Sequence, residues 1–198
     1  MRKKLGLMLA GTSLGLLGAC SDSSAPVTDG DWQMLFDGST LANLSVAGEA
    51  NWRIEEDAVV ADDSTGVSFL VSNEDYADFE LELEFWVNTE ANSGIFLRCS
   101  DRDAISDTSC YEVNIYDTRS DQTYRTGGIV HLVAPAEFVY TGGQWNRYEI
   151  RADGNRLQVT LNGRDMVDVE DSQLTSGPVA LQYGSGTVKF RNVRIRSL

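Results

Sequence analysis

Hydrophobic and polar residues alternate along three stretches near the middle of the chain. From Phe79 to Val87 every second residue is apolar, and three glutamates and a tryptophan stand between the apolar positions. Residues 93–98 and 111–116 have shorter versions of the same pattern. Period-two alternation predicts strands with one buried face and one open face. The side chains expected in the core are Leu81, Leu83, Phe85, Ile95, Leu97, Val113 and Ile115.

Short alternating runs separated by turn residues continue over the rest of the chain. Asp153-Gly154 and Asn162-Gly163 lie between such runs, and dipeptides of this kind are strong hairpin signals. No window of about 11 to 18 residues has helical periodicity. Many short strands at even spacing are typical of an antiparallel sandwich or barrel. The sequence therefore predicts a single all-β domain, an antiparallel two-sheet β-sandwich.

The open face of these strands has the composition of a sugar site. If the three stretches share one sheet, that face carries carboxylates, an amide, an arginine and aromatic rings. Parity places Arg98 beside Phe96, and it places Glu112 and Asn114 opposite the buried face of their strand. We therefore expect Arg98, Glu112 and Asn114 to converge.

The first thirty residues have a different character from the domain. Residues 1–20 combine a basic start, a short apolar run and small residues before Cys20, which indicates a bacterial lipoprotein signal peptide. Cys20 is then the expected lipidated residue, and residues 21–30 form a flexible tether. The folded domain is expected over residues 31–198. Ser21, and not an aspartate, follows Cys20, which by resemblance to the enterobacterial sorting rule favours lipid anchoring in the outer membrane of the cell envelope. A periplasmic location is the alternative.

Charge excludes one class of partner. Without Arg2, Lys3 and Lys4, 13 basic residues remain against 30 acidic residues, which gives a net charge of −17. Nucleic-acid binding needs a basic footprint, so it is excluded as a function.

Cys99 and Cys110 are the only cysteines after Cys20. In an oxidising compartment this pair predicts a disulfide that closes a short polar loop. Two free thiols are the alternative. The spacing fits no zinc pattern.

A long irregular excursion, residues 118–143, interrupts the regular strands and carries His131, the only histidine of the chain. Functional residues often lie on such excursions. A structural cover is the alternative.

Several motifs, in order, resemble the 3-keto-disaccharide hydrolase domain family. They are Leu35-Phe-Asp-Gly-Ser-Thr-Leu41, Asp78-Phe-Glu-Leu-Glu-Leu-Glu-Phe85, Asn92-Ser-Gly-Ile-Phe-Leu-Arg98, Tyr111-Glu-Val-Asn-Ile115 and Phe190-Arg-Asn-Val-Arg-Ile195. The resemblance implies a concanavalin A-like jelly roll. It also implies a hydrolase or lyase that acts on glycosides oxidised at C3, with a small glycoside or oligosaccharide as its partner.

A ketone at C3 acidifies the C2 proton, so a base there can expel the C1 substituent, after which water adds. Such a site needs one base and a cationic group at the C3 oxygen. Glu112 or His131 is the candidate base. Arg98 or a divalent metal cation is the candidate for stabilising the negative charge on the C3 oxygen. Asn114 and Gln182 are expected to hold hydroxyls, and Trp86 or Tyr116 to stack on the sugar.

Other interpretations stay open at this point. Arg98 and Glu112 could form a cross-strand ion pair, and Glu80, Glu82 and Glu84 could be a solvated face or a metal site. The sequence Gln182-Tyr183-Gly184 stands where the family often has Gln-Asp-His. The absence of that histidine favours an alternative function, a non-catalytic carbohydrate-binding surface lipoprotein.

Overall fold

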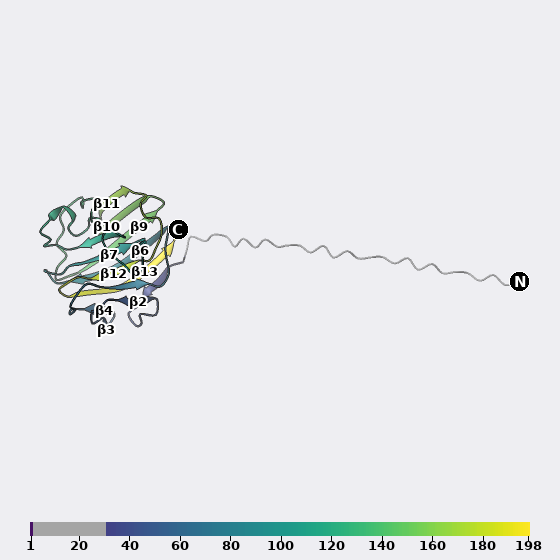
Figure 1. Ribbon diagram of the computed structural model, residues 1–198, viewed down its shortest axis with the longest axis horizontal. Helices are drawn as coiled ribbons and strands as arrows, with labels where there is room; N and C mark the ends of the chain where they lie inside the picture. Colours follow the sequence, from purple (N-terminus) through teal and green to yellow (C-terminus); the bar gives the residue numbers. More distant parts are fainter. Residues whose placement is uncertain (2–30) are drawn as a thin grey trace.

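A computed structural model describes Met1 and residues 31–198, which form a sandwich of two β-sheets (Figure 1). The predicted signal peptide, the tether and Cys20 lie outside the described residues, apart from Met1. No helix in the described part is long and apolar enough to cross a membrane.

Eight strands form the first sheet, which we call sheet A, in the order β11-β10-β9-β6-β13-β4-β3, with β1 also paired to β13. Their bounds are β1 Gln33–Phe36, β3 Arg53–Glu55, β4 Ala58–Ala61, β6 Phe79–Val87, β9 Trp145–Asp153, β10 Arg156–Leu161, β11 Arg164–Glu170 and β13 Val188–Ser197.

Five strands form the second sheet, sheet B, in the order β2-β5-β12-β7-β8. They are β2 Leu44–Ala47, β5 Ser68–Ser72, β12 Ala180–Tyr183, β7 Ser93–Leu97 and β8 Tyr111–Ile115. Every strand pair in both sheets is antiparallel. One 3₁₀ turn, η1 at Gln122–Tyr124, is the only helical element of the described residues. The all-β sandwich prediction is confirmed.

The core lies between the sheets, because each strand turns its apolar alternate residues inward. Along β6, fully buried residues alternate with half-buried ones over the whole strand. All seven side chains predicted for the core are at most 1% exposed.

One expectation about the sheets is wrong. The stretch 79–87 is β6 of sheet A, whereas β7 and β8 belong to sheet B. The outward residues of β6 therefore lie on the opposite side of the molecule from Glu112. Alternation predicts which residues share a face of one strand, but it does not specify which sheet that strand joins.

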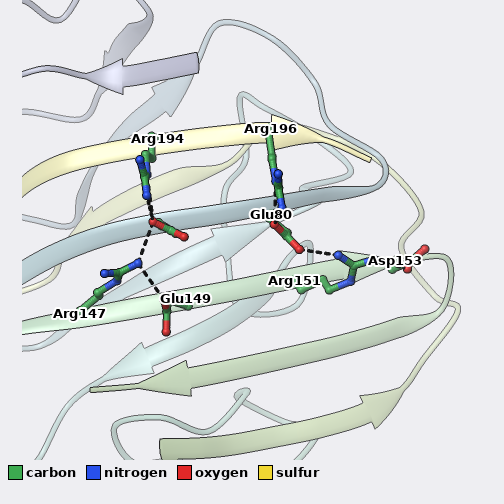
Figure 2. Close-up of polar contacts among 8 residues, drawn as sticks. Glu80, Arg147, Glu149, Arg151, Asp153, Arg194 and Arg196 are labelled. Atoms are coloured by element: carbon green, nitrogen blue, oxygen red, sulfur yellow. Dashed lines mark hydrogen bonds and ion pairs between the residues drawn. The ribbon is translucent and has the colours of Figure 1, made fainter. Parts of the chain in front are cut away.

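Two of the three outward glutamates of β6 are held between arginines of the two neighbouring strands (Figure 2). Glu80 accepts from Arg196 of β13 and Arg151 of β9, and Glu82 accepts from Arg194 and Arg147 of the same two strands.

Glu84 accepts from Arg191 of β13. These carboxylates line an exposed ladder of ion pairs, and no group of three acidic, histidine or cysteine side chains within the described residues is placed to hold a metal. The metal-site interpretation of these glutamates is therefore wrong.

The sheet B edge is held by the predicted disulfide. Cys99 and Cys110 are bonded, with their Cα atoms 4.2 Å apart, and they close the loop between β7 and β8. The register of that pair sets Phe96 opposite Glu112 and Gly94 opposite Asn114.

The excursion 118–143 is tied to the sandwich by Asp117, a buried residue at its start. One carboxylate oxygen accepts from the Thr141 and Gly142 amides at 2.6 and 3.1 Å. The other accepts from the Thr126 and Thr141 hydroxyls at 2.6 and 3.1 Å. Asp117 thereby joins the two ends of the excursion to the end of β8.

Replacing Asp117 with alanine leaves three buried donors and the part-buried Gly142 amide without their acceptor, and a buried donor costs about 1–3 kcal/mol when unsatisfied. We expect Asp117→Ala to lower the free energy of unfolding by roughly 3 kcal/mol or more, measured by urea denaturation. Asp63→Ala, at an exposed aspartate, is the matched control. Equal stability of the two variants would contradict the role given to Asp117.

Candidate functional site

The outer face of sheet B forms the candidate site, and strand register fixes its layout. Gln182 of β12 lies opposite Phe69 of β5. β12 and β7 pair through Leu181 and Ile95, and continuing that register places Gln182 beside Gly94. Gly94 lies opposite Asn114 of β8. We call Gln182, Gly94, Asn114 and Glu112 the floor.

Glu112 is the central group of the floor. It is 6% exposed although it points out of the sandwich. Burial and, to a smaller extent, the negative charge of Asp107 raise the pKa of its carboxyl to about 7, against the opposing positive charge of Arg119. Within the described residues no hydrogen bond stabilises its carboxylate form. A carboxyl of this kind exchanges a proton near neutral pH.

Gly94 leaves the space that Glu112 uses. A Cβ at this position would lie 2.9 Å from Glu112 Oε1 and 3.1 Å from its Cγ. The glutamate side chain thus bends over the glycine, toward the middle of the floor, and any larger residue would displace it.

Two buried amide oxygens of the floor have no donor among the described residues. They are Oδ1 of Asn114 and Oε1 of Gln182. Nδ2 of Asn114 donates to the carbonyl of Tyr124, so the end of η1 covers the amide from the loop side. Buried acceptors without donors cost free energy, and a hydroxyl-rich ligand would satisfy them after a rotation of the amide.

Aromatic rings continue the floor on one side. Phe96 is buried on the outer face of β7, and its ring meets the edge of Phe69 with centroids 5.2 Å apart. Neither ring was predicted as a site residue, although strand parity places Phe96 on the same face as Glu112.

We call Asp107, His131 and Arg119 the rim, because Asp107 and Arg119 act on Glu112 through their charges and His131 pairs with Asp107. Nε2 of His131 lies 3.0 Å from Oδ2 of Asp107. Arg119 and Asp107 were missed as site residues, because only the folding of two separate loops brings them to β8.

Arg98 does not join the floor. Its backbone has a φ of 50°, which breaks the strand alternation directly after β7. Its buried guanidinium donates to the carbonyls of Ala77 and Gly154 at 2.7 and 2.8 Å and pairs with Asp78 at 3.1 Å. The predicted convergence of Arg98 with Glu112 is therefore wrong, and so is the alternative ion pair between them.

The two candidate stacking residues lie in different places. Trp86 is on the outer face of sheet A, where Lys189 lies 5.1 Å from its ring centroid, so it cannot reach the floor. Tyr116 directly follows β8, is half-buried, and has the parity of Asn114.

Gly184, directly after β12, has no room for a histidine side chain. A Cβ on Gly184 would lie 2.8 Å from both Nδ2 and the carbonyl oxygen of Asn92. The preceding Tyr183 points into the core, with its ring edge against Trp52. In this chain the side chain and the carbonyl of Asn92 occupy the space that a side chain at position 184 would need.

A larger hollow of about 500 Å³ opens on the excursion and is lined by Gln122, Thr123, Ala134, Pro135, Ala136, Glu137 and Phe138. None of the floor residues lines it. The floor is therefore the better candidate for chemistry, because it combines a proton-exchanging carboxyl with unsatisfied acceptors.

Glu112 should destabilise the folded protein when it is ionised. Because its folded pKa is above that of an unfolded glutamate, the folded state holds the proton more tightly, and stability falls as pH rises from about 4.5 to about 7. We expect Glu112→Gln to match the wild type at pH 4.5. At pH 8 it should be more stable by on the order of 3 kcal/mol.

Urea denaturation at the two pH values measures this difference. Glu90→Gln, at an exposed glutamate, is the control and should be neutral at both. A Glu112→Gln variant that is no more stable than wild type at pH 8 would rule out the raised pKa.

Comparisons with known proteins agree with this fold. Two crystal structures of proteins from Parabacteroides distasonis, provisionally described as glycosyl hydrolases, are similar. One has a TM-score of 0.75 at 17% identity, covering 84% of this chain and 94% of that one. The other has a TM-score of 0.70 at 24% identity, covering 85% and 100%.

The carbohydrate-binding module CBM66 from Bacillus subtilis has a TM-score of 0.59 at 21% identity, covering 78% of this chain and 96% of the module. At these identities the likeness shows the fold alone, which confirms the jelly roll. No curated protein matches the sequence significantly.

The sequence itself matches the family model of the 3-keto-alpha-glucoside-1,2-lyase-like domain over residues 31–196. This match covers most of the chain and confirms the resemblance seen in its motifs. The protein therefore belongs to the 3-keto-alpha-glucoside-1,2-lyase-like domain family.

Proposed function

We propose that the protein cleaves the glycosidic bond of 3-keto-glycosides, with Glu112 as the base that removes the C2 proton. The observation that carries the proposal is the environment of Glu112: a carboxyl on a sheet face, 6% exposed, with a pKa near 7. A general base works best when its pKa lies close to the working pH.

The reaction has two stages. Glu112 takes the proton from C2, the C1–O bond breaks, and a C1–C2 double bond forms next to the C3 ketone. The aglycone oxygen leaves with the electron pair of that bond. Water then adds to C1 as a hydroxyl, the proton it releases neutralises the aglycone oxygen, and Glu112 returns its proton to C2. The sum is hydrolysis, and the base is regenerated. This chemistry needs a single carboxylate and not the carboxylate pair of ordinary glycosidases.

Negative charge develops on the C3 oxygen in the first stage. We assign its stabilisation to Arg119, which takes the role first expected of Arg98. Arg119 acts on Glu112 through its charge, and none of the ion pairs found within residues 31–198 involves its guanidinium. A cation that has no competing carboxylate is available to a ligand.

The remaining floor residues are assigned to binding. The amide oxygens of Gln182 and Asn114, which have no donor among the described residues, accept sugar hydroxyls, and the buried Phe96 packs beside them. A divalent cation at the ketone oxygen is a separate hypothesis. The described residues contain no cluster of three metal-ligating side chains, so we route no step through a metal.

A second candidate function is carbohydrate binding without catalysis. It is favoured by Gly184, which stands where the family often has a histidine, and by the fold that the chain shares with a carbohydrate-binding module. Binding alone requires the acceptors of the floor but gives no reason for a buried carboxyl with a raised pKa.

The activity test uses a purified domain and a 3-keto-glucoside with a chromogenic leaving group. We expect kcat/KM to rise about tenfold per pH unit below Glu112's pKa of about 7 and to level off above it. Glu112→Gln should lower it by roughly 10²- to 10⁴-fold.

Glu90→Gln should retain wild-type activity, and parallel assays with a chelator test the cation hypothesis. Wild-type protein that binds the substrate without releasing the aglycone would favour the binding function. Full activity of Glu112→Gln would remove Glu112 as the base.

We also propose that the protein is exported and lipid-anchored through Cys20, with residues 21–30 as the tether. The signal-like sequence that ends at Leu17-Gly18-Ala19-Cys20 supports this. Mass spectrometry of protein extracted from membranes should show diacylglycerol on Cys20. A Cys20→Ser variant should appear in the soluble fraction, and an unmodified Cys20 in membrane-extracted protein would overturn the anchor.

A further inference from the structure

A second hollow lies over the edge of sheet B, next to the floor. It has a volume of about 300 Å³, and its lining includes Asp107, Thr108, Val130, His131, Leu132 and Leu174. The amide of Val130, which lines the hollow, donates to the carbonyl of Glu112 at 3.0 Å, so the hollow borders the segment that pairs with β8, the strand of the proposed base.

We propose that this hollow is the leaving-group subsite and that His131, positioned by Asp107, protonates the departing oxygen. The assignment rests on the proposed function, because it needs Glu112 as the base on the other side of the scissile bond. The subsite would take an uncharged group about the size of one ring, a hexose or a phenol, since Asp107 and Asp171 in its lining disfavour anions.

His131 is held from several sides. Its backbone has a φ of 63°, a conformation that is strained for a residue other than glycine. Nε2 pairs with Asp107, and the ring makes an edge contact with Tyr124, with centroids 5.9 Å apart. Nδ1 therefore has a fixed direction, and the side chain is 55% exposed, so a ligand can reach it.

Asp107 connects the two catalytic groups. It lies on the loop closed by the disulfide, bonds the imidazole of His131, and acts by its charge on Glu112. A carboxylate on one ring nitrogen orients a histidine so that the other nitrogen can donate and accept a proton. Asp107 is thus a positioning residue for His131.

The proton balance closes with these two groups. In the elimination, the C2 proton goes to Glu112, and the Nδ1 proton of His131 goes to the oxygen that leaves C1. In the hydration, His131 takes a proton from the water that attacks C1, and Glu112 gives its proton to C2. Both residues return to their starting states, and no oxidant or further reactant is needed.

The experiment compares two 3-keto-glucosides that differ in their leaving group. The oxygen of 4-nitrophenol departs as a stable anion, whereas the oxygen of methanol must be protonated. We measure kcat/KM of wild type, His131→Asn and Asp107→Asn on both. Asparagine tolerates a positive φ, so His131→Asn preserves the backbone. Asp103→Asn, at an exposed aspartate in the same loop, is the matched control.

We expect His131→Asn to lower kcat/KM for the methyl glycoside by roughly 10²-fold or more and for the 4-nitrophenyl glycoside by less than about tenfold. Asp107→Asn should also lower kcat/KM more for the methyl glycoside than for the 4-nitrophenyl glycoside, but by smaller factors than His131→Asn. It should also shift the rise of the 4-nitrophenyl pH profile to lower pH, because a charge that raises the pKa of Glu112 is removed.

Asp103→Asn should match wild type on both substrates. Equal losses on the two substrates in His131→Asn and Asp107→Asn, or no loss in either variant, would overturn the subsite. If His131→Asn does not fold, the test rests on Asp107→Asn alone: the ratio of its kcat/KM losses on the two glycosides then supports or overturns the subsite. Wild-type protein that cleaves neither glycoside would instead remove the proposed function, and this assignment with it.

Discussion

The antiparallel register of β7 and β8 determines which side chains meet on the outer face of sheet B. It sets Phe96 opposite Glu112 and Gly94 opposite Asn114. A slip by one residue would turn Glu112 into the core and expose Val113, which is fully buried. The burial of the apolar residues on the inner face of β7 and β8 therefore determines which residues form the floor. The Cys99–Cys110 disulfide fixes the loop that joins the two strands.

That register places the carboxyl of Glu112 where few groups of the protein stabilise its negative charge. Most glutamates of this chain lie in water or between arginines, as on the outer face of sheet A (Figure 2). Glu112 lacks such a partner, and its burial shifts the balance toward the protonated form. Residues that are costly for the folded state and lie on an open face are typical of functional sites.

Local sequence was sufficient for the strands and for the parity of Glu112, because alternation is a property of neighbouring residues. It was insufficient for Trp86, whose strand joins the other sheet. It was also insufficient for Arg98, because a single positive φ after β7 redirects that side chain to carbonyls of three distant segments. Arg119 and Asp107 lie on the irregular loops that flank β8, where alternation does not predict the direction of a side chain. Sheet membership, strand ends and loop placement are long-range properties, and alternation carries no information on them.

The position of β13 has a consequence for how the molecule can be made. It is the last strand along the chain, yet it lies inside sheet A, between β6 and β4, and it also pairs with β1. The pairing of β6 and β4 through β13 therefore cannot be completed until synthesis has passed residue 197. Until then β6 and β4 expose unpaired edges, which makes the nascent chain dependent on protection from aggregation. Such non-local pairing also predicts slow folding, in the millisecond-to-second range of about 10⁻³ to 1 s.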